Sequence, residues 1–259
     1  FKNRMEDFPV KVEMMSRFRT AGEINRILKE TEAGSIDILI GTHAILRKDI
    51  KFKDLGLVII DEEQRFGVKD KEKLKKIRLL VDVLTLTATP IPRTLYMSLM
   101  GVKDMSIIET PPQDRLPVEV IVAEYDDTLI KKAMLFEKKR KGQVFFIHNR
   151  IEGIEKIAER IRGLVPDLKV AVAHGRMHSK ELEGIMKEFM KGSIDVLVST
   201  VIIESGIDIP NANTLIVNRS DMFGLADLYQ LKGRVGRFKN KAYAYFFVPR
   251  GHVLSGESG

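Results

Sequence analysis

Short apolar runs alternate with stretches of helical periodicity along almost the whole chain. The clearest run is Leu57–Gln64, in which four apolar residues lead directly into three acidic residues and a glutamine. Continuous apolar runs rich in β-branched residues are typical of parallel strands that are covered on both faces. The pattern predicts strands over residues 10–15, 36–40, 57–60, 81–86, 106–108, 118–123, 143–147, 169–173, 194–198, 214–218 and 242–248. It predicts helices over residues 21–31, 69–78, 94–100, 127–140, 151–164 and 225–231.

One linker and one internal repeat indicate two similar lobes. Glu109–Pro117 contains three prolines among mostly polar residues, a composition typical of linkers. Gly34–Thr42 and Gly192–Thr200 match almost position for position, and a helix is expected before each copy. We therefore predict an α/β fold with two lobes, each a mainly parallel sheet flanked by helices, and domains over residues 1–112 and 113–259. Residues 251–259 are expected to be a frayed or artificial tail.

The composition narrows the class of protein. The 259 residues are 44% hydrophobic, which is enough for real cores in one or two domains. No apolar run approaches the roughly 20 residues of a membrane helix, and no signal peptide pattern is visible. The lack of cysteine excludes disulfides and cysteine-ligated zinc, and it leads us to expect a cytoplasmic protein. A net charge of +7 favours polyanionic partners.

The acidic end of the predicted strand 57–60 is a candidate catalytic site. In open α/β sheets, ligands bind beyond the carboxyl ends of the strands. An aspartate there, Asp61, can hold Mg²⁺ through water, and its neighbour Glu62 can polarise the water that attacks a terminal phosphate. The alternative is a strand that ends in a solvated acidic turn, and these residues alone favour that alternative slightly.

Other stretches carry residues suited to phosphate. Thr42 follows a strand and a glycine, which allows close approach of a phosphate, although an ordinary turn has the same composition. Arg17, in an Arg-Phe-Arg cluster, could contact phosphates, but a solvated loop is at least as compatible. Arg234 and Arg237 are three residues apart, so we expect both on one helical face beside a reacting phosphate; the alternative is a surface ion-pair cluster.

Taken together, these stretches resemble the superfamily 2 helicase motor, which has two RecA-like lobes. Asp61–Gln64 is similar to the Walker B motif, and Thr87–Thr89 is similar to motif III. Thr200–Asp208 and Gln230–Arg237 are similar to motifs V and VI. The segment from Thr87 to Thr94 and the acidic motif resemble the corresponding motifs of the branch that contains RecG and the transcription-repair coupling factors.

The resemblance implies an ATP hydrolase with Mg²⁺ as its metal and double-stranded DNA as its track. Asp61 would organise Mg²⁺ through water, and Glu62 would activate the attacking water. The residues that would sense the nucleotide or complete its site from the other lobe are Gln64, Gln230, Arg234 and Arg237. Motif V would link ATP to DNA through Gly206 and Asp208. The residues that would line the DNA track are Arg17, Thr42, Thr87, His174, Arg176 and Thr200.

One departure from the family pattern is large. The sequence contains no Gly-Lys dipeptide, and therefore no G-x-x-x-x-G-K-[ST] phosphate loop. Because residue 1 is Phe, we expect a fragment that begins inside the first lobe and is inactive alone. In the intact protein, the resemblance implies displacement of stalled RNA polymerase, with the polymerase and repair proteins bound by other domains. A RecG-type fork-remodelling helicase and a catalytically dead nucleic-acid-binding module are the alternatives.

Overall fold

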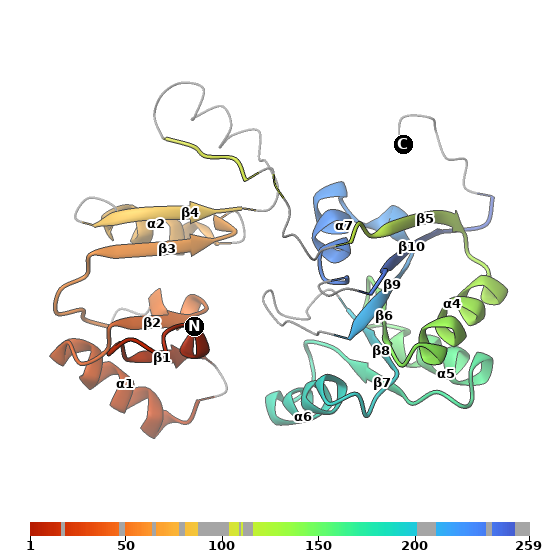
Figure 1. Ribbon diagram of the computed structural model, residues 1–259, viewed down its shortest axis with the longest axis horizontal. Coiled ribbons are helices and arrows are strands. Elements are labelled where there is room, and N and C mark those ends of the chain that lie inside the picture. Colours follow the sequence, from red (N-terminus) through yellow and green to blue (C-terminus); the bar gives the residue numbers. More distant parts are fainter. Residues whose placement is uncertain are drawn as a thin grey trace. The chain divides into compact units, whose positions relative to one another are not determined.

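The computed structural model describes residues 1–16, 19–46, 50–63, 66–77, 81–87, 104–108, 110, 116–200, 211–236 and 240–251 (Figure 1). The chain divides into two compact units, Phe1–Pro90 and Ile91–Gly259. Every strand pair in the described residues is parallel, and helices follow most of the strands. The predicted α/β class is confirmed. The domain boundary between residues 112 and 113 stays a prediction.

The first unit begins with a strand, a helix and a second strand that pairs with the first. After the 3-10 turn η1 the elements are β1 (Val12–Met15), α1 (Ala21–Ala33) and β2 (Ile38–Gly41). Thr20 caps α1 in a reciprocal capping box with Glu23, and the helix ends at Gly34, whose φ of 75° is easy only for glycine. A cap at each end therefore sets the length of α1.

The acidic strand belongs to a second pair in the same unit. The elements are η2 (His43–Leu46), β3 (Leu57–Asp61), α2 (Val68–Ile77) and β4 (Asp82–Leu86). Ile60 packs with Leu46 and Leu74 from η2 and α2. Burial on both faces was expected for this strand, and that expectation is wrong, because Leu57 and Ile59 are each about half exposed. The described helices pack only on the face that carries Ile60.

The second unit is a six-stranded parallel sheet with helices on both faces. Its strand order is β5-β10-β9-β6-β8-β7. Helices α4 and α5 pack on one face, and α6 and α7 pack on the other. The elements are β5 (Glu119–Glu124), α4 (Asp127–Lys139), β6 (Gln143–His148), α5 (Ile154–Leu164), β7 (Val170–Ala173), α6 (Ser179–Met190), β8 (Val196–Ser199), β9 (Ala212–Asn218), η4 (Ser220–Met222), α7 (Leu225–Lys232) and β10 (Tyr243–Val248).

The internal repeat is structural as well as sequential. In the first copy, the Lys11 N–H donates to Asp37 Oδ2 at 2.8 Å, and the N–H groups of Asp37 and Ile38 both donate to the Lys11 carbonyl at 3.1 Å. In the second copy, Lys169 and Asp195 repeat the first of these bonds at 2.9 Å. The segments β1–α1–β2 and β7–α6–β8 therefore have the same local architecture. Their threonines, Thr42 and Thr200, follow equivalent strands, as predicted.

A buried ionic cluster holds α4 against the sheet of the second unit. Glu137 is 0% exposed. It accepts hydrogen bonds from Arg140 Nη2 at 2.7 Å, Thr214 Oγ1 at 2.5 Å and Asn213 Nδ2 at 3.2 Å. Gly142 lies so close that a Cβ there would stand 1.6 Å from Glu137 Oε1. The cluster thus requires both a carboxylate on α4 and a glycine after it.

One predicted strand is absent. Residues 104–108 carry no regular structure, and Ile107 and Ile108 are 71% and 91% exposed. The short apolar run of residues 106–108 pairs with no described strand, so the prediction there is wrong. The predicted helix 94–100 and most of the linker lie outside the described residues. None of the described helices has the length and apolar character needed to cross a bilayer.

Candidate functional site

The acidic strand end of the first unit joins three of the predicted site residues. β3 pairs with β4 so that Asp61 lies opposite Leu86, one residue before Thr87. The Glu62 N–H donates to the Leu86 carbonyl at 2.9 Å, and Thr87 Oγ1 donates to Glu62 Oε2 at 3.4 Å. Glu62 has a φ of 54°, which is uncommon for a residue with a side chain and costs on the order of 1–3 kcal/mol. Strained backbone of this kind is typical of functional sites.

Magnesium is compatible with this strand end in one specific way. The described residues contain no group of three or more His, Cys, Asp or Glu that could hold a metal. Asp61 is exposed at the carboxyl end of β3, with Glu62 beside it. Mg²⁺ is usually bound by one or two carboxylates together with water and substrate phosphates. Asp61 therefore fits the ion only in company with a phosphate ligand, and it would hold the ion directly or through water.

The carboxyl edge of the six-stranded sheet gathers polar side chains in the second unit. β6 pairs with β9 so that His148 lies opposite Asn218, and β8 pairs with β7 so that Ser199 lies opposite Ala173. His174 and Thr200 follow β7 and β8 directly. Parallel strands end at the same edge, so these groups share one edge.

Three polar atoms at this edge are buried without a hydrogen-bond partner among the described residues: Ser199 Oγ, Thr200 Oγ1 and His174 Nδ1. Ser199 is 0% and Thr200 4% exposed. A buried polar atom is costly without a partner, and unsatisfied groups of this kind are typical of ligand sites. The edge therefore suits a ligand with many hydrogen-bond acceptors, such as a phosphate.

His148 belongs to the same edge, although the sequence analysis did not select it. Its Nδ1 lies 3.3 Å from Asn218 Nδ2. Burial lowers the pKa of His148, and the charges of Arg150 and Arg219 lower it further, against a hydrogen bond with the Glu152 backbone. The imidazole is therefore held neutral near pH 7. Its position as the last residue of β6, directly after an apolar run, is the sequence signal that could have identified it.

Arg176 is the predicted cation at this edge. Its Nη1 lies 3.2 Å from Glu152 Oε1, and both side chains are about 70% exposed. Exposed pairs of this kind contribute only about 0–1 kcal/mol. Arg176 can therefore exchange this partner for a phosphate at little cost.

Gln230 and Arg234 differ in setting. Gln230 lies on α7, but the helix ends at Lys232, and Arg234 follows in a turn. Gly236 then has a φ of 71°, and a Cβ there would stand 2.6 Å from Ala242 Cβ. Arg234 therefore does not stand on a helical face, and that part of the expectation is wrong; Arg237 lies outside the described residues.

Several predicted site residues lie outside the described residues and stay predictions: Arg17, Gln64, Gly206, Asp208 and Arg237.

Comparison with known families identifies these two units. Residues 1–98 match the DEAD/DEAH box helicase family, and residues 126–239 match the helicase conserved C-terminal domain. Transcription-repair-coupling factors of Bacillus subtilis and Myxococcus xanthus are both 57% identical to this chain, over 98% and 96% of its length. The chain belongs to the superfamily 2 helicases. Its branch is the one that contains RecG and the transcription-repair coupling factors.

The chain spans about a fifth of the length of these relatives, 22% and 21% respectively. Among solved structures, RecG bound to a three-way DNA junction has a TM-score of 0.72 at 35% identity and covers 97% of this chain and 34% of its own. Dbp5 of S. cerevisiae, bound to RNA and ADP BeF3, has a TM-score of 0.71 at 15% identity and covers 96% of this chain and 66% of its own. The second likeness shows the fold alone. The predicted pair of RecA-like lobes is confirmed.

Proposed function

We propose that this chain is the ATP-dependent motor of a transcription-repair coupling factor, which moves along double-stranded DNA and displaces stalled RNA polymerase. The observation that carries the proposal is the 57% identity to a curated coupling factor over 98% of the chain. The polymerase and repair proteins would be bound by parts of the protein beyond this chain. The expected place of action is the cytoplasm.

ATP with Mg²⁺ is the proposed fuel. Asp61 would hold the ion, and Glu62 would polarise the attacking water. The position of both residues at a carboxyl strand end, and the strained backbone of Glu62, support these roles. The residues proposed to sense the nucleotide or stabilise the transferred phosphate are Gln64, Gln230, Arg234 and Arg237.

Duplex DNA is the proposed track. The buried Thr200 hydroxyl, which has no partner among the described residues, and the weakly paired Arg176 support phosphate contacts at the carboxyl edge of the second unit. Thr42 occupies the equivalent place in the first unit. Further contacts are proposed for Arg17, Thr87 and His174, and Gly206 and Asp208 would couple these contacts to ATP.

The chain alone should not hydrolyse ATP. It has no Gly-Lys dipeptide, and so it lacks the phosphate loop that supplies the strongest contacts to the β- and γ-phosphates. We expect at best very weak binding of Mg-ATP. Calorimetry on the chain tests this, and a micromolar affinity would contradict it.

A RecG-type fork-remodelling helicase is the second candidate. It is favoured by the 35% identity to RecG, whose structure contains a three-way DNA junction. The third candidate, a catalytically dead nucleic-acid-binding module, is disfavoured because Asp61, Glu62 and Arg234 are all retained. A site that no longer hydrolyses ATP would not require both the acidic residues and the arginine.

A chimera separates these candidates. This chain would replace the matching 254-residue segment of the Bacillus subtilis coupling factor, to which it is 57% identical. We expect ATP hydrolysis stimulated by linear duplex DNA and abolished by Glu62→Gln. Hydrolysis stimulated only by forked DNA would favour the RecG-type candidate. A folded chimera that hydrolyses no ATP would favour the third candidate, the nucleic-acid-binding module.

A further inference from the structure

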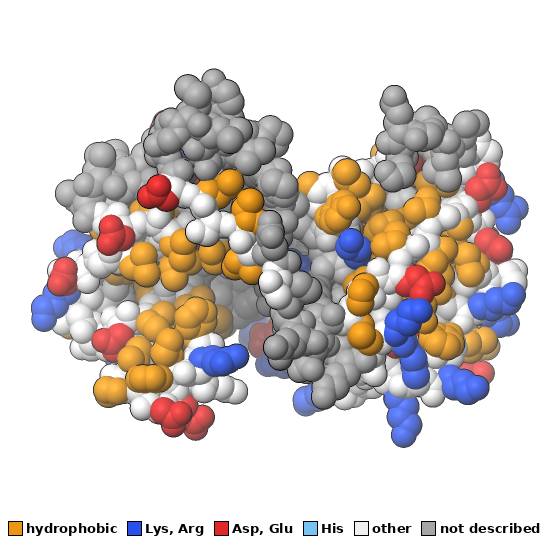
Figure 2. Space-filling view, turned by 45° about the horizontal axis from the view of Figure 1, so that its top comes forward, with side chains coloured by type: hydrophobic (Ala, Val, Ile, Leu, Met, Phe, Trp, Pro, Cys, Tyr) orange, Lys and Arg blue, Asp and Glu red, His pale blue; other side chains and the backbone are white. Residues whose placement is uncertain are grey.

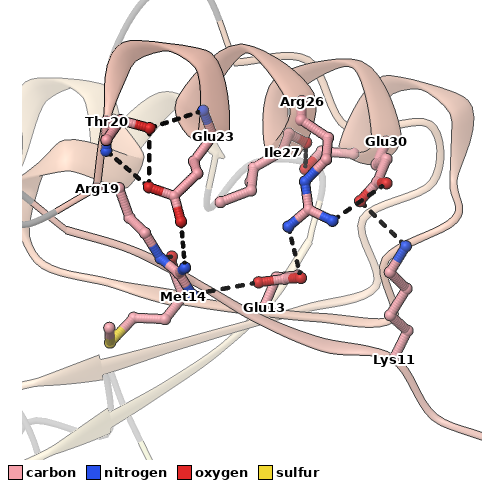
Figure 3. A network of polar contacts seen from close by, with 10 residues as sticks. Lys11, Glu13, Met14, Arg19, Thr20, Glu23, Arg26, Ile27 and Glu30 are labelled. Atoms are coloured by element: carbon pink, nitrogen blue, oxygen red, sulfur yellow. Dashed lines mark hydrogen bonds and ion pairs between the residues drawn. The ribbon is translucent and has the colours of Figure 1, made fainter.

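Arg19 follows β1 by four residues, and its guanidinium is held by groups on both sides (Figure 3). Its backbone N–H donates to the Ser16 carbonyl at 3.2 Å, which closes a turn. Arg19 Nη1 donates to Glu23 Oε1 at 2.7 Å, and Nε donates to the Met14 carbonyl at 3.4 Å. Nη2 lies 3.7 Å from Glu13 Oε2. One side chain thus joins the strand before the turn to the helix after it.

Glu13 is the buried end of this connection. It is 8% exposed in the middle of β1, where an unpaired carboxylate would be costly. Arg26 Nη2, from the second turn of α1, donates to Glu13 Oε1 at 3.1 Å. Glu13 therefore sits between two guanidiniums, and removal of its charge would release Arg19 on one side.

The charges of this cluster balance. Three cations (Lys11, Arg19, Arg26) face three carboxylates (Glu13, Glu23, Glu30). The side chain of Arg19 is only 27% exposed. The Arg-Phe-Arg cluster was a candidate for phosphate contacts or a solvated loop, and Arg19 is the one residue of it that the structure describes. Its charge is already committed to carboxylates, so it is a poor ligand for a phosphate.

The internal repeat shows what this position does in the other unit. There the Met177 N–H donates to the His174 carbonyl at 3.1 Å, the counterpart of the bond from Arg19 to Ser16. The His174 N–H in turn donates to Met177 Sδ at 3.4 Å. In both units the side chain of this fourth residue bonds to backbone at or near the end of the preceding strand: the Arg19 guanidinium donates to the Met14 carbonyl, and the Met177 thioether accepts from the His174 N–H.

The turn lies beside a close backbone contact. Met15 pairs with Gly41 at the ends of β1 and β2, and a Cβ at position 41 would stand 2.6 Å from the Met15 carbonyl oxygen. Thr42, a proposed DNA contact, follows at once. A shift of the chain at the end of β1 would therefore displace Gly41 and, with it, the position of Thr42.

We propose that Arg19 is a positioning residue of the DNA-binding edge: through Glu13, Glu23 and the Met14 carbonyl it fixes the peptide that leaves β1, and it does not itself contact DNA. This inference rests on the proposed function, because it assumes that the β1–β2 edge binds the DNA backbone. It separates the arginines of the Arg-Phe-Arg segment by role, and leaves Arg17 as the phosphate ligand.

Two substitutions distinguish positioning from direct contact. Glu13→Gln removes a negative charge close to the DNA edge, so electrostatics alone predicts tighter DNA binding, whereas loss of positioning predicts weaker binding. Arg19→Lys keeps the charge but loses the planar fork that donates to Glu23 and to the Met14 carbonyl and places Nη2 3.7 Å from Glu13 Oε2. As a direct phosphate contact, lysine would largely replace arginine; as a positioning residue, it would not.

The experiment is fluorescence anisotropy of the chain with a labelled linear duplex at several salt concentrations. We expect Glu13→Gln and Arg19→Lys each to weaken binding about fivefold, as when a charge-assisted phosphate contact is misaligned but not removed. Glu32→Gln and Lys29→Gln make charge changes of each sign on exposed positions of α1 and should stay within about twofold. Thr20→Ala removes the helix cap but not the guanidinium contacts, so it should lower the melting temperature and leave affinity unchanged.

The outcomes are distinct. Tighter binding by Glu13→Gln, or wild-type affinity of folded Arg19→Lys, would overturn the positioning role and leave the proposed function intact. If Glu13→Gln does not fold, Arg19→Lys decides alone. A folded wild-type chain with no affinity for duplex DNA would overturn the proposed DNA edge, and the positioning role with it.

Discussion

Replacing Glu137 by glutamine should lower the free energy of unfolding of the second unit by about 3 kcal/mol. The carboxylate is fully buried and accepts bonds from Arg140, Thr214 and Asn213. Glutamine keeps the size but turns one oxygen into a donor, so at least one of these donors meets another donor. Breaking a buried pair costs about 3–5 kcal/mol. The lower end applies because Arg140 keeps its bond to the Lys241 carbonyl at 2.6 Å and its side chain is 24% exposed.

Tyrosine fluorescence reports mainly on this unit. The chain has no tryptophan, and four of its five tyrosines, Tyr125, Tyr229, Tyr243 and Tyr245, lie in the unit with the six-stranded sheet, whereas Tyr96 lies within the match to the first helicase domain. We would measure urea unfolding of wild type and Glu137→Gln, with Glu152→Gln as a matched control. Glu152 pairs with Arg176 on the exposed surface, so its loss should cost at most about 1 kcal/mol. A cost for Glu137→Gln no larger than that of the control would refute the assignment of Glu137 as a buried anchor.

Three further predictions concern single residues. Hydrogen bonds from the Thr20 backbone and then from Arg19 lower the pKa of Glu23 from 4.5 to about 2. The ionised Glu23 side chain therefore stabilises the fold fully above pH 4.5, and this stabilisation is lost as the pH falls through 2. The difference in melting temperature between wild type and Glu23→Gln should shrink over that range, and a constant difference would contradict this. Because Glu62 has a φ of 54°, the free energy of unfolding of Glu62→Gly should be about 1 kcal/mol higher than that of Glu62→Ala in thermal melts. The reverse order would argue against backbone strain at this position. Gly236→Ala should lower the midpoint of tyrosine-monitored unfolding, because its Cβ would stand 2.6 Å from Ala242 Cβ at a φ of 71°; an unchanged midpoint would show that the turn can relax.

Most strands were predictable because a parallel sheet buries them as continuous apolar runs. β3 and β6 appear in the sequence as such runs and in the structure at nearly the predicted residues. The covered faces were not predictable in the same way. Periodicity marks a residue as apolar but does not say which helix packs on it, and so the exposure of Leu57 and Ile59 was missed.

The site divides in the same manner. Asp61, Glu62 and Thr200 could be selected because each lies at or just beyond the end of an apolar strand. Ser199 was missed because it lies between the predicted strand 194–198 and Thr200 and no pattern marks it, and only the structure shows that it ends β8 with a hydroxyl that has no partner among the described residues. The pairing of Arg19 with Glu13 joins a strand to the turn after it, and charge order along the chain does not reveal it.

The most direct test of the account is triplex displacement on a linear duplex by the chimera that carries this chain in the Bacillus subtilis coupling factor. A motor that moves along double-stranded DNA removes the third strand when ATP is present and leaves the two strands of the duplex paired. We predict displacement by the chimera and none by its Glu62→Gln variant, with equal thermal stability of the two proteins. A folded chimera that hydrolyses ATP but displaces no third strand, or that separates the duplex instead, would contradict the account.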